Sequence, residues 1–213
     1  MWIAFSVAAL VALLIFATIR TNCRLHETTE RIYQQLAGPV NGKVSQMPPI
    51  LGRMTALEVP VQGGKAFYHI LDKQISFYVQ SPELKNCMHL WINDNMRKTL
   101  GSYKSGDPDF DRVFSIYKGP GDTDIFLEMF DQNCRRAMLQ LKAKATEDVV
   151  NIWIELIHVR PRDDIFSIKI NNFLLPKMGM TWHPYDISVY KDLLDKSMGV
   201  WLSFRQSACT GPL

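Results

Sequence analysis

The sequence has few of the residue patterns that mark a chemical site. Its cysteines, Cys23, Cys87, Cys134 and Cys209, lie far apart and form no CxxC pair of the kind that binds zinc or makes a redox motif. Its five histidines form no HxxxH or HExxH pair, and no GxSxG or P-loop pattern occurs. The sequence therefore offers no catalytic residue and no cofactor site, and it favours a protein without an enzymatic role.

The chain also has little excess charge of either sign. The chain has 24 Lys and Arg against 21 Asp and Glu, a net charge of +3 and a pI near 8.6. A dedicated nucleic-acid binder carries a concentrated positive field, so we expect no nucleic-acid partner. The sparse cysteines suit a reducing compartment, although their even number leaves a disulfide open.

What the sequence does contain is an uncharged run at its amino terminus. Residues 1–19 include no charged side chain. As a helix this run would be about 28 Å long, close to the roughly 30 Å hydrocarbon thickness of a bilayer. A cleaved secretory signal is the alternative, but its positive first region and small-residue cleavage site are not evident. The sequence therefore predicts a transmembrane helix over residues 1–19, with the lipid bilayer as a partner.

Trp2, Arg20 and Arg24 are the residues expected to hold this helix in the membrane. Basic residues follow the apolar run and none precedes it, and basic residues are enriched on the cytoplasmic side of membrane spans. Trp2 would then lie at the opposite interface. We expect a single-pass protein of the cell inner membrane, with its amino terminus outside and its domain in the cytoplasm; the inverted topology is the alternative.

The rest of the chain predicts a stalk, one domain and a tail. Residues 20–38 have a narrow apolar stripe, and Gly38 with Pro39 ends the expected helical stalk. The domain spans residues 39–204, long enough to bury a core without metal or disulfide. Residues 205–213 are small and polar and are expected to form a tail.

The fold class predicted for this domain is α+β, with a mainly antiparallel sheet and two packed amphipathic helices. Short runs of aromatic and branched residues bounded by turn residues predict strands, and apolar residues at helical spacing predict helices. The expected strands cover residues 51–61, 66–71, 75–79, 88–92, 150–156 and 165–170, and the expected helices cover 125–145 and 185–204. The order of the strands does not follow from the sequence.

The sequence GDPDFDR is the most distinctive segment of the chain. Its carboxylates, Asp107, Asp109 and Asp111, lie at alternate positions, as in loops that bind hard cations. A calcium loop of the EF-hand type would need glycine at its sixth position and glutamate at its twelfth, where this chain has arginine and lysine. Two interpretations stay open: a divalent-cation site, and a turn that buries Phe110 and Phe114.

The same segment carries a resemblance to other proteins. A stretch with the pattern G-D-x-x-F-D-x-x-F is formed by Gly106, Asp107, Phe110, Asp111 and Phe114. In this stretch, and across roughly residues 100–202, the chain resembles uncharacterised bacterial single-pass membrane proteins with a domain of unknown function. The resemblance implies an anchor followed by a compact domain, and it implies no activity.

Two functions follow from these expectations. The first is a membrane-anchored, non-enzymatic accessory or scaffold subunit that binds other subunits of a larger membrane protein assembly. The second is a membrane-tethered hydrolase or sensor with a divalent-cation site near Asp107 to Asp111. An anchor joined to a domain without a reactive signature favours the first.

Overall fold

The structure is a computed structural model. It describes residues 2–71, 74–86, 90–94, 103–118, 130–148, 152–160, 164–172 and 186–209. Side chains are described for fewer residues, and those of residues 2–9 are not among them.

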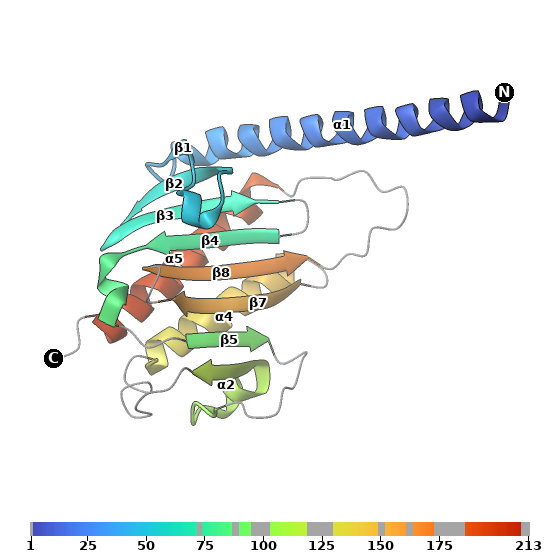
Figure 1. Cartoon of the computed structure of the whole chain (residues 1–213). Helices are drawn as coiled ribbons and strands as arrows, with labels where there is room; N and C mark the ends of the chain where they lie inside the picture. Colours follow the sequence, from blue (N-terminus) through green and yellow to red (C-terminus); the bar gives the residue numbers. More distant parts are fainter. Residues whose placement is uncertain are drawn as a thin grey trace.

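Long helices stand at the two ends of the described chain and strands fill most of the rest (Figure 1). The elements are, in order, α1 (Trp2–Ala37), β1 (Lys43–Gln46), η1 (Pro49–Leu51), β2 (Thr55–Val61), β3 (Gly64–Ile70), β4 (Gln74–Gln80), η2 (Pro82–Asn86), β5 (Leu90–Asp94), α2 (Pro108–Val113), β6 (Phe114–Lys118), α4 (Gln132–Asp148), β7 (Ile152–Arg160), β8 (Ile165–Asn172) and α5 (Ile187–Cys209).

The strands form one eight-stranded sheet in the order β1-β2-β3-β4-β8-β7-β5-β6. Every described pair is antiparallel. The first four strands form a meander, and the hairpin of β7 and β8 is inserted between β4 and β5. The expected α+β domain with an antiparallel sheet is therefore present.

Helices α4 and α5 cover one face of this sheet, behind the strands in Figure 1. The apolar stripe expected on α4 is buried at Cys134, Met138 and Leu141, and the stripe expected on α5 is buried at Tyr190 and Trp201. Burial of these side chains at i, i+3, i+4 and i+7 spacing is what holds an amphipathic helix on a sheet. The two predicted helices are confirmed as the layer that packs on the sheet.

Helix α4 begins later than the sequence predicts. Residues 119–129 lie outside the described residues, but Phe130 and Asp131 are not helical and the helix starts at Gln132. The Asp131 carboxylate accepts a hydrogen bond from the backbone N–H of Cys134 at 2.8 Å, as an N-cap does. Because Asp131 caps the amino terminus of α4, the helix starts directly after it, and the predicted start at residue 125 is wrong.

The carboxyl-terminal end of α5 contacts η2 and the turn between β2 and β3. Arg205 forms an ion pair with Glu83 of η2, with 2.7 Å between Nε and Oε2, and Trp201 Nε1 donates to the carbonyl of Gln62 at 3.2 Å. Gly63 lies beneath the ion pair with φ of +83°, and a Cβ there would lie 2.6 Å from Arg205 Nε. Helix α5 therefore continues through Cys209, into the segment expected to be a tail.

The predicted transmembrane helix over residues 1–19 is wrong. Among the residues that the structure describes, no helix offers an apolar stretch long enough to cross a bilayer. The expected single-pass topology and inner-membrane location depend on this span and are therefore not supported either.

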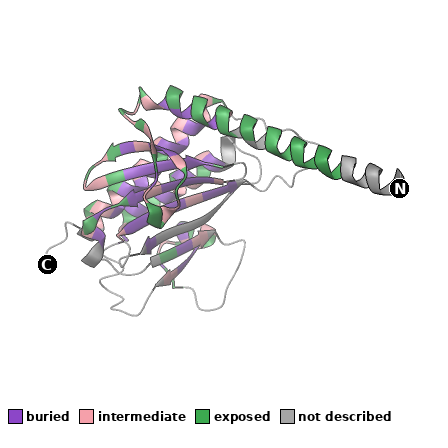
Figure 2. Cartoon of the chain, turned by 45° about the horizontal axis from the view of Figure 1, so that its top comes forward, coloured by how far each residue is buried: buried purple, intermediate pink, exposed green. Residues whose placement is uncertain are grey.

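The expected stalk is the second half of the same helix. Helix α1 runs without interruption from Trp2 to Ala37, and its carboxyl-terminal half lies against β1, β2 and α5. Thr29, Ile32, Tyr33 and Leu36 form the buried stripe of this contact, at helical spacing. The amino-terminal half continues beyond the domain (Figures 1 and 2).

Tyr33 also makes the polar contact between α1 and the sheet. Its hydroxyl accepts a hydrogen bond from the backbone N–H of Ile70 at 2.8 Å, beyond Tyr68, the last β3 residue that pairs with β2. Burial raises the pKa of Tyr33 above its usual range, so the hydroxyl stays protonated. The contact satisfies a donor at the end of β3 that β2 does not reach.

Tyr33→Phe should lower the free energy of unfolding by about 1–3 kcal/mol, because the buried N–H of Ile70 loses its acceptor. Urea unfolding followed by circular dichroism measures the loss. Tyr103→Phe is the control: Tyr103 is 41% exposed, and its substitution should leave the midpoint almost unchanged. An equal effect of the two substitutions would contradict the assignment.

Candidate functional site

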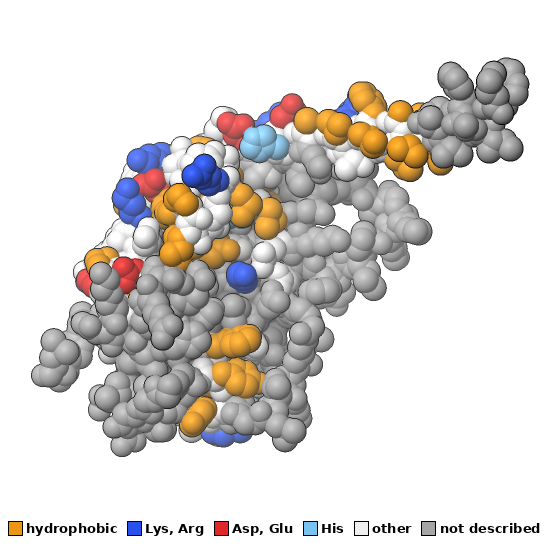
Figure 3. Space-filling model, viewed as in Figure 1, with side chains coloured by type: hydrophobic (Ala, Val, Ile, Leu, Met, Phe, Trp, Pro, Cys, Tyr) orange, Lys and Arg blue, Asp and Glu red, His pale blue; other side chains and the backbone are white. Residues whose placement is uncertain are grey.

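The most distinctive exposed surface is the part of α1 that extends beyond the domain. We define residues 10–19 as the arm. Its large apolar side chains are each about half to two-thirds exposed: Leu10 64%, Val11 48%, Leu13 68%, Leu14 59%, Ile15 56%, Phe16 64% and Ile19 56%. Figure 3 shows apolar side chains gathered along this half of the helix. Contiguous exposed apolar surface of this kind marks an interaction site.

Apolar side chains lie on every side of the arm. At about 100° per residue, its seven large apolar side chains leave no gap wider than about 60° around the helix axis. A surface helix of a globular domain has one apolar stripe that faces the core. A helix that is apolar on all sides is normally buried on all sides. The arm is therefore a segment that other chemical groups must surround.

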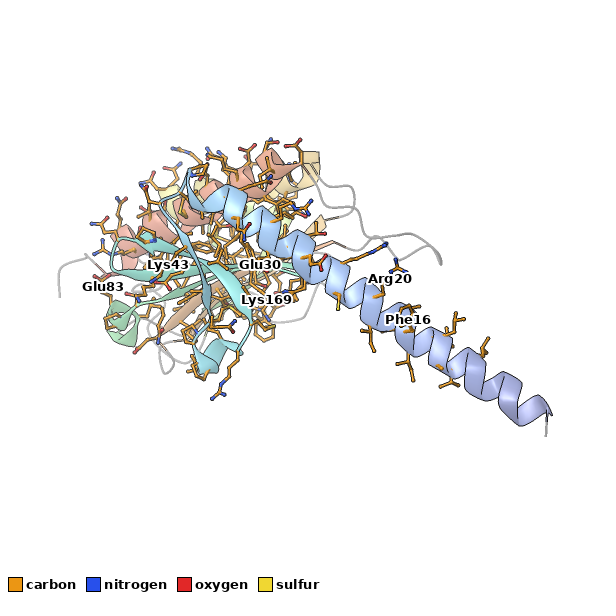
Figure 4. All side chains as sticks on the ribbon, turned by 90° about the horizontal axis from the view of Figure 1, so that it is seen from above. Phe16, Arg20, Glu30, Lys43, Glu83 and Lys169 are labelled. Atoms are coloured by element: carbon orange, nitrogen blue, oxygen red, sulfur yellow. The ribbon has the colours of Figure 1, made fainter. Side chains whose placement is uncertain are left out.

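The arm offers almost nothing polar to a partner. Thr18 is its only polar residue, and its hydroxyl donates to the carbonyl of Leu14 within the same helix at 2.8 Å. The charged residues begin with Arg20, just past the arm (Figure 4). Contacts made by the arm are therefore apolar.

The residues expected to anchor the chain all belong to α1. Arg20 and Arg24 are exposed, on the part of α1 that precedes its contact with the domain. The side chain of Trp2 lies outside the described residues. Arg20 and Arg24 are surface charges next to the arm, and their role as anchor residues stays a prediction.

The first carboxylate of the GDPDFDR segment caps a helix. Asp107 is the N-cap of α2, and its Oδ1 accepts the backbone N–H groups of Asp109 at 3.1 Å and Phe110 at 3.2 Å. Its Oδ2 lies 3.7 Å from Nε of Arg135 on α4. Asp107 thus starts α2 and joins it to the helix layer.

The other two carboxylates also have local partners. Asp111 accepts hydrogen bonds from the N–H and the hydroxyl of Ser105, both at 2.9 Å. Asp109 is exposed and pairs with Arg112 at 3.1 Å. In the described part of the chain, no group of three or more His, Cys, Asp or Glu side chains is placed to hold a metal ion. No observation therefore favours the divalent-cation site at Asp107, Asp109 and Asp111, which stays a prediction.

The phenylalanines of this segment are buried, as the turn interpretation expects. Phe110 and Phe114 are 0% and 1% exposed, and their ring centroids lie 4.9 Å apart. Phe130 packs edge-on against Phe110 at 5.1 Å. The segment is a short helix leading into strand β6, and it serves to close the β6 end of the core.

The sheet face opposite the helices carries residues that the sequence did not single out. Tyr68 points to the helices, because its hydroxyl donates to the carbonyl of Tyr190 on α5 at 3.0 Å. Since side chains alternate along a strand, His69 points to the other face, where it pairs with Ser76 of β4. His69 and Ser76 are 5% and 0% exposed, and the Ser76 hydroxyl has no hydrogen-bond partner among the described residues. No sequence motif marks this pair, because only the strand register brings it together.

Burial lowers the pKa of His69 below its usual value, since the charged imidazolium loses hydration inside the protein. His69 is therefore neutral at pH 7. Burial likewise raises the pKa of the Cys134 thiol, so this cysteine is not a thiolate nucleophile. Both groups behave as parts of the core.

Comparisons of the chain with protein-family models, with curated protein sequences and with solved structures found no match. The resemblance to bacterial single-pass membrane proteins is not tested by these comparisons.

Asp107→Ala should destabilise the protein by about 1 kcal/mol, because α2 loses its N-cap. Asp107→Asn should recover most of the loss, since the amide oxygen still caps the helix. Thermal or urea unfolding measures both. Asp109→Ala is the matched control within the same turn: its carboxylate is exposed, and exposed ion pairs contribute little. A larger effect at Asp109 than at Asp107 would contradict the capping role.

Stability should fall on acidification in part through His69. Its pKa in the folded chain lies below the usual value of about 6.5, so the unfolded chain binds the proton more readily. The contribution of neutral His69 to the free energy of unfolding is complete above about pH 6.5. It is lost as the pH falls towards the pKa of His69 in the folded chain, and the free energy of unfolding changes by at most about 1.4 kcal/mol per pH unit. Urea midpoints from pH 7 to 5 should show a shallower slope in His69→Asn. His26→Asn, at an exposed site, should keep the parent slope, and equal slopes in all three proteins would refute the assignment.

Proposed function

We propose that this chain is a non-enzymatic accessory or scaffold subunit of a larger protein assembly, and that the arm is the element through which it binds. The observation that supports the proposal is the exposed, uncharged, apolar surface of the arm on all sides of α1. The domain then remains outside the contact, at a fixed position relative to the assembly.

The energetics of burial support this role for the arm. Full burial of a large apolar side chain contributes about 1.5–3 kcal/mol, and seven such side chains of the arm are about half to two-thirds exposed. Their combined burial can exceed the lower estimates of the cost of association, about 4 kcal/mol. The arm alone can therefore sustain a specific contact.

The attachment of α1 to the domain supports a scaffold role. Tyr33 and Leu36 are each 1% exposed, buried where α1 meets the domain, and the Tyr33 hydroxyl binds the sheet backbone. Helix α1 is continuous from the arm to this contact. A partner bound to the arm is thus connected to the domain through a single helix, which limits how the domain can reorient.

The test is recovery of the tagged full-length chain from its native source, followed by mass spectrometry of the proteins that come with it. The variant Leu13→Glu with Phe16→Glu should reduce recovery of stoichiometric partners at least tenfold, because charge enters the apolar contact. The control is Ile50→Glu with Met54→Glu, which alters exposed apolar side chains of similar size outside α1. Unchanged recovery with the arm variant would refute the proposal.

A further inference from the structure

We infer that Asn41, in the turn between α1 and β1, is a site of covalent modification. Its side-chain amide is lost by spontaneous deamidation, at a rate set by how often the carboxyl-terminal end of α1 opens. Asn41 is the only asparagine of the sequence that glycine follows. Glycine at the next position favours this reaction, because it has no side chain to hinder the approach of its nitrogen.

The reaction needs only the groups of this turn and water. The backbone nitrogen of Gly42 gives up its proton and attacks the side-chain carbonyl carbon of Asn41. A carbon–nitrogen bond forms, the bond to the amide nitrogen breaks, and ammonia leaves. Water then opens the cyclic imide at one of its two carbonyl carbons, so residue 41 becomes aspartate or isoaspartate.

The fold accounts for both residues of this pair. Asn41 has a φ of +51°, a left-handed conformation that asparagine adopts more readily than most residues. A Cβ on Gly42 would lie 2.9 Å from the carbonyl oxygen of Glu58 on β2, so glycine is required where the chain enters β1. Lys43, labelled in Figure 4, is the first residue of that strand. The close approach to β2 thus requires the residue that makes Asn41 reactive.

In the closed turn the attacking nitrogen is already engaged. The N–H of Gly42 donates to the carbonyl of Ala37 at 2.8 Å, and the N–H of Asn41 donates to the carbonyl of Gly38 at 3.2 Å. These are the two hydrogen bonds of a Schellman cap. The Asn41 side chain is exposed to water, but the hydrogen bond of Gly42 opposes loss of its proton. The reaction therefore takes place when the cap opens.

Opening of this cap is linked to the contact between α1 and the domain. Tyr33 and Leu36 lie within about one turn of Ala37 and are each 1% exposed. Val40, inside the cap, packs against the same core. Opening the cap therefore draws the end of α1 away from this core. When opening and closing are fast, the rate of a reaction in the open form follows the population of that form.

The isoaspartate product changes the connection between α1 and β1. Its backbone passes through the side-chain Cβ, which adds one carbon between Val40 and Gly42. The Gly42 N–H is then out of register with the carbonyl of Ala37, so the Schellman cap is lost. The modified chain should therefore unfold at a lower urea concentration than the parent, and equal urea midpoints would contradict this consequence.

The experiment follows Asn41 by peptide mass spectrometry in the purified full-length chain, kept in mildly alkaline buffer with and without urea. Conversion should be slower in the folded chain than in the unfolded chain. The ratio of the two rates should equal the hydrogen-exchange protection of the Gly42 N–H, because both reactions need the same opening. Tyr33→Phe should raise the rate in the folded chain by roughly fivefold or more, and Tyr103→Phe should leave it unchanged.

Equal conversion rates in the folded and unfolded chains would overturn the inference, and so would faster conversion at another asparagine. An unchanged rate in folded Tyr33→Phe would also overturn it, with circular dichroism used to establish that this variant is folded. The comparison with hydrogen exchange needs no variant, so it decides the matter if Tyr33→Phe does not fold. Asn41→Gln should abolish the conversion of this peptide.

Discussion

The contact between α1 and the domain is the constraint on which the rest of the structure depends. Ile32, Tyr33 and Leu36 belong to the same core as the sheet and α5, and the Tyr33 hydroxyl satisfies a backbone donor at the end of β3. Without this contact, the second half of α1 would be a short amphipathic helix with little reason to stay folded alone. With it, α1 is fixed at its carboxyl-terminal end and its other end is directed away from the domain.

The sheet supports this arrangement because the long helices α1, α4 and α5 lie on one side of it. Helices α4 and α5 fill the face where Tyr68 meets Tyr190, and α1 adds to the same layer beside α5. The segment GDPDFDR completes the core at the opposite edge, where Asp107 caps α2 and reaches Arg135 of α4. The carboxylates with the spacing of a cation loop thus have structural partners within the domain, and the arm is the large apolar surface left outside it.

The sequence predicts the elements better than their arrangement. Alternating residues identify most strands, and Cys134, Met138 and Leu141 mark the buried side of α4 correctly, because side-chain periodicity reflects which face is covered. The start of α4 does not follow from the sequence, because several aspartates before it could cap a helix and only the structure shows that Asp131 does. The insertion of β7 and β8 between β4 and β5 depends on contacts distant in sequence, as does the pair of His69 and Ser76. The uncharged run at the amino terminus predicts a membrane span because its length matches a bilayer, but length alone does not identify what surrounds a helix.

The arm contributes little to the fold of its own chain. Leu13 and Phe16 are about two-thirds exposed, so they contribute little to the stability of the single folded chain, and their exposure to water is unfavourable. The buried stripe at Ile32 and Leu36 already attaches α1 to the domain, so the arm is not needed for that purpose either. A segment whose apolar side chains do not serve its own domain gains stability only when other molecules cover it. Because those side chains lie on all sides of the helix, the covering contact must enclose it.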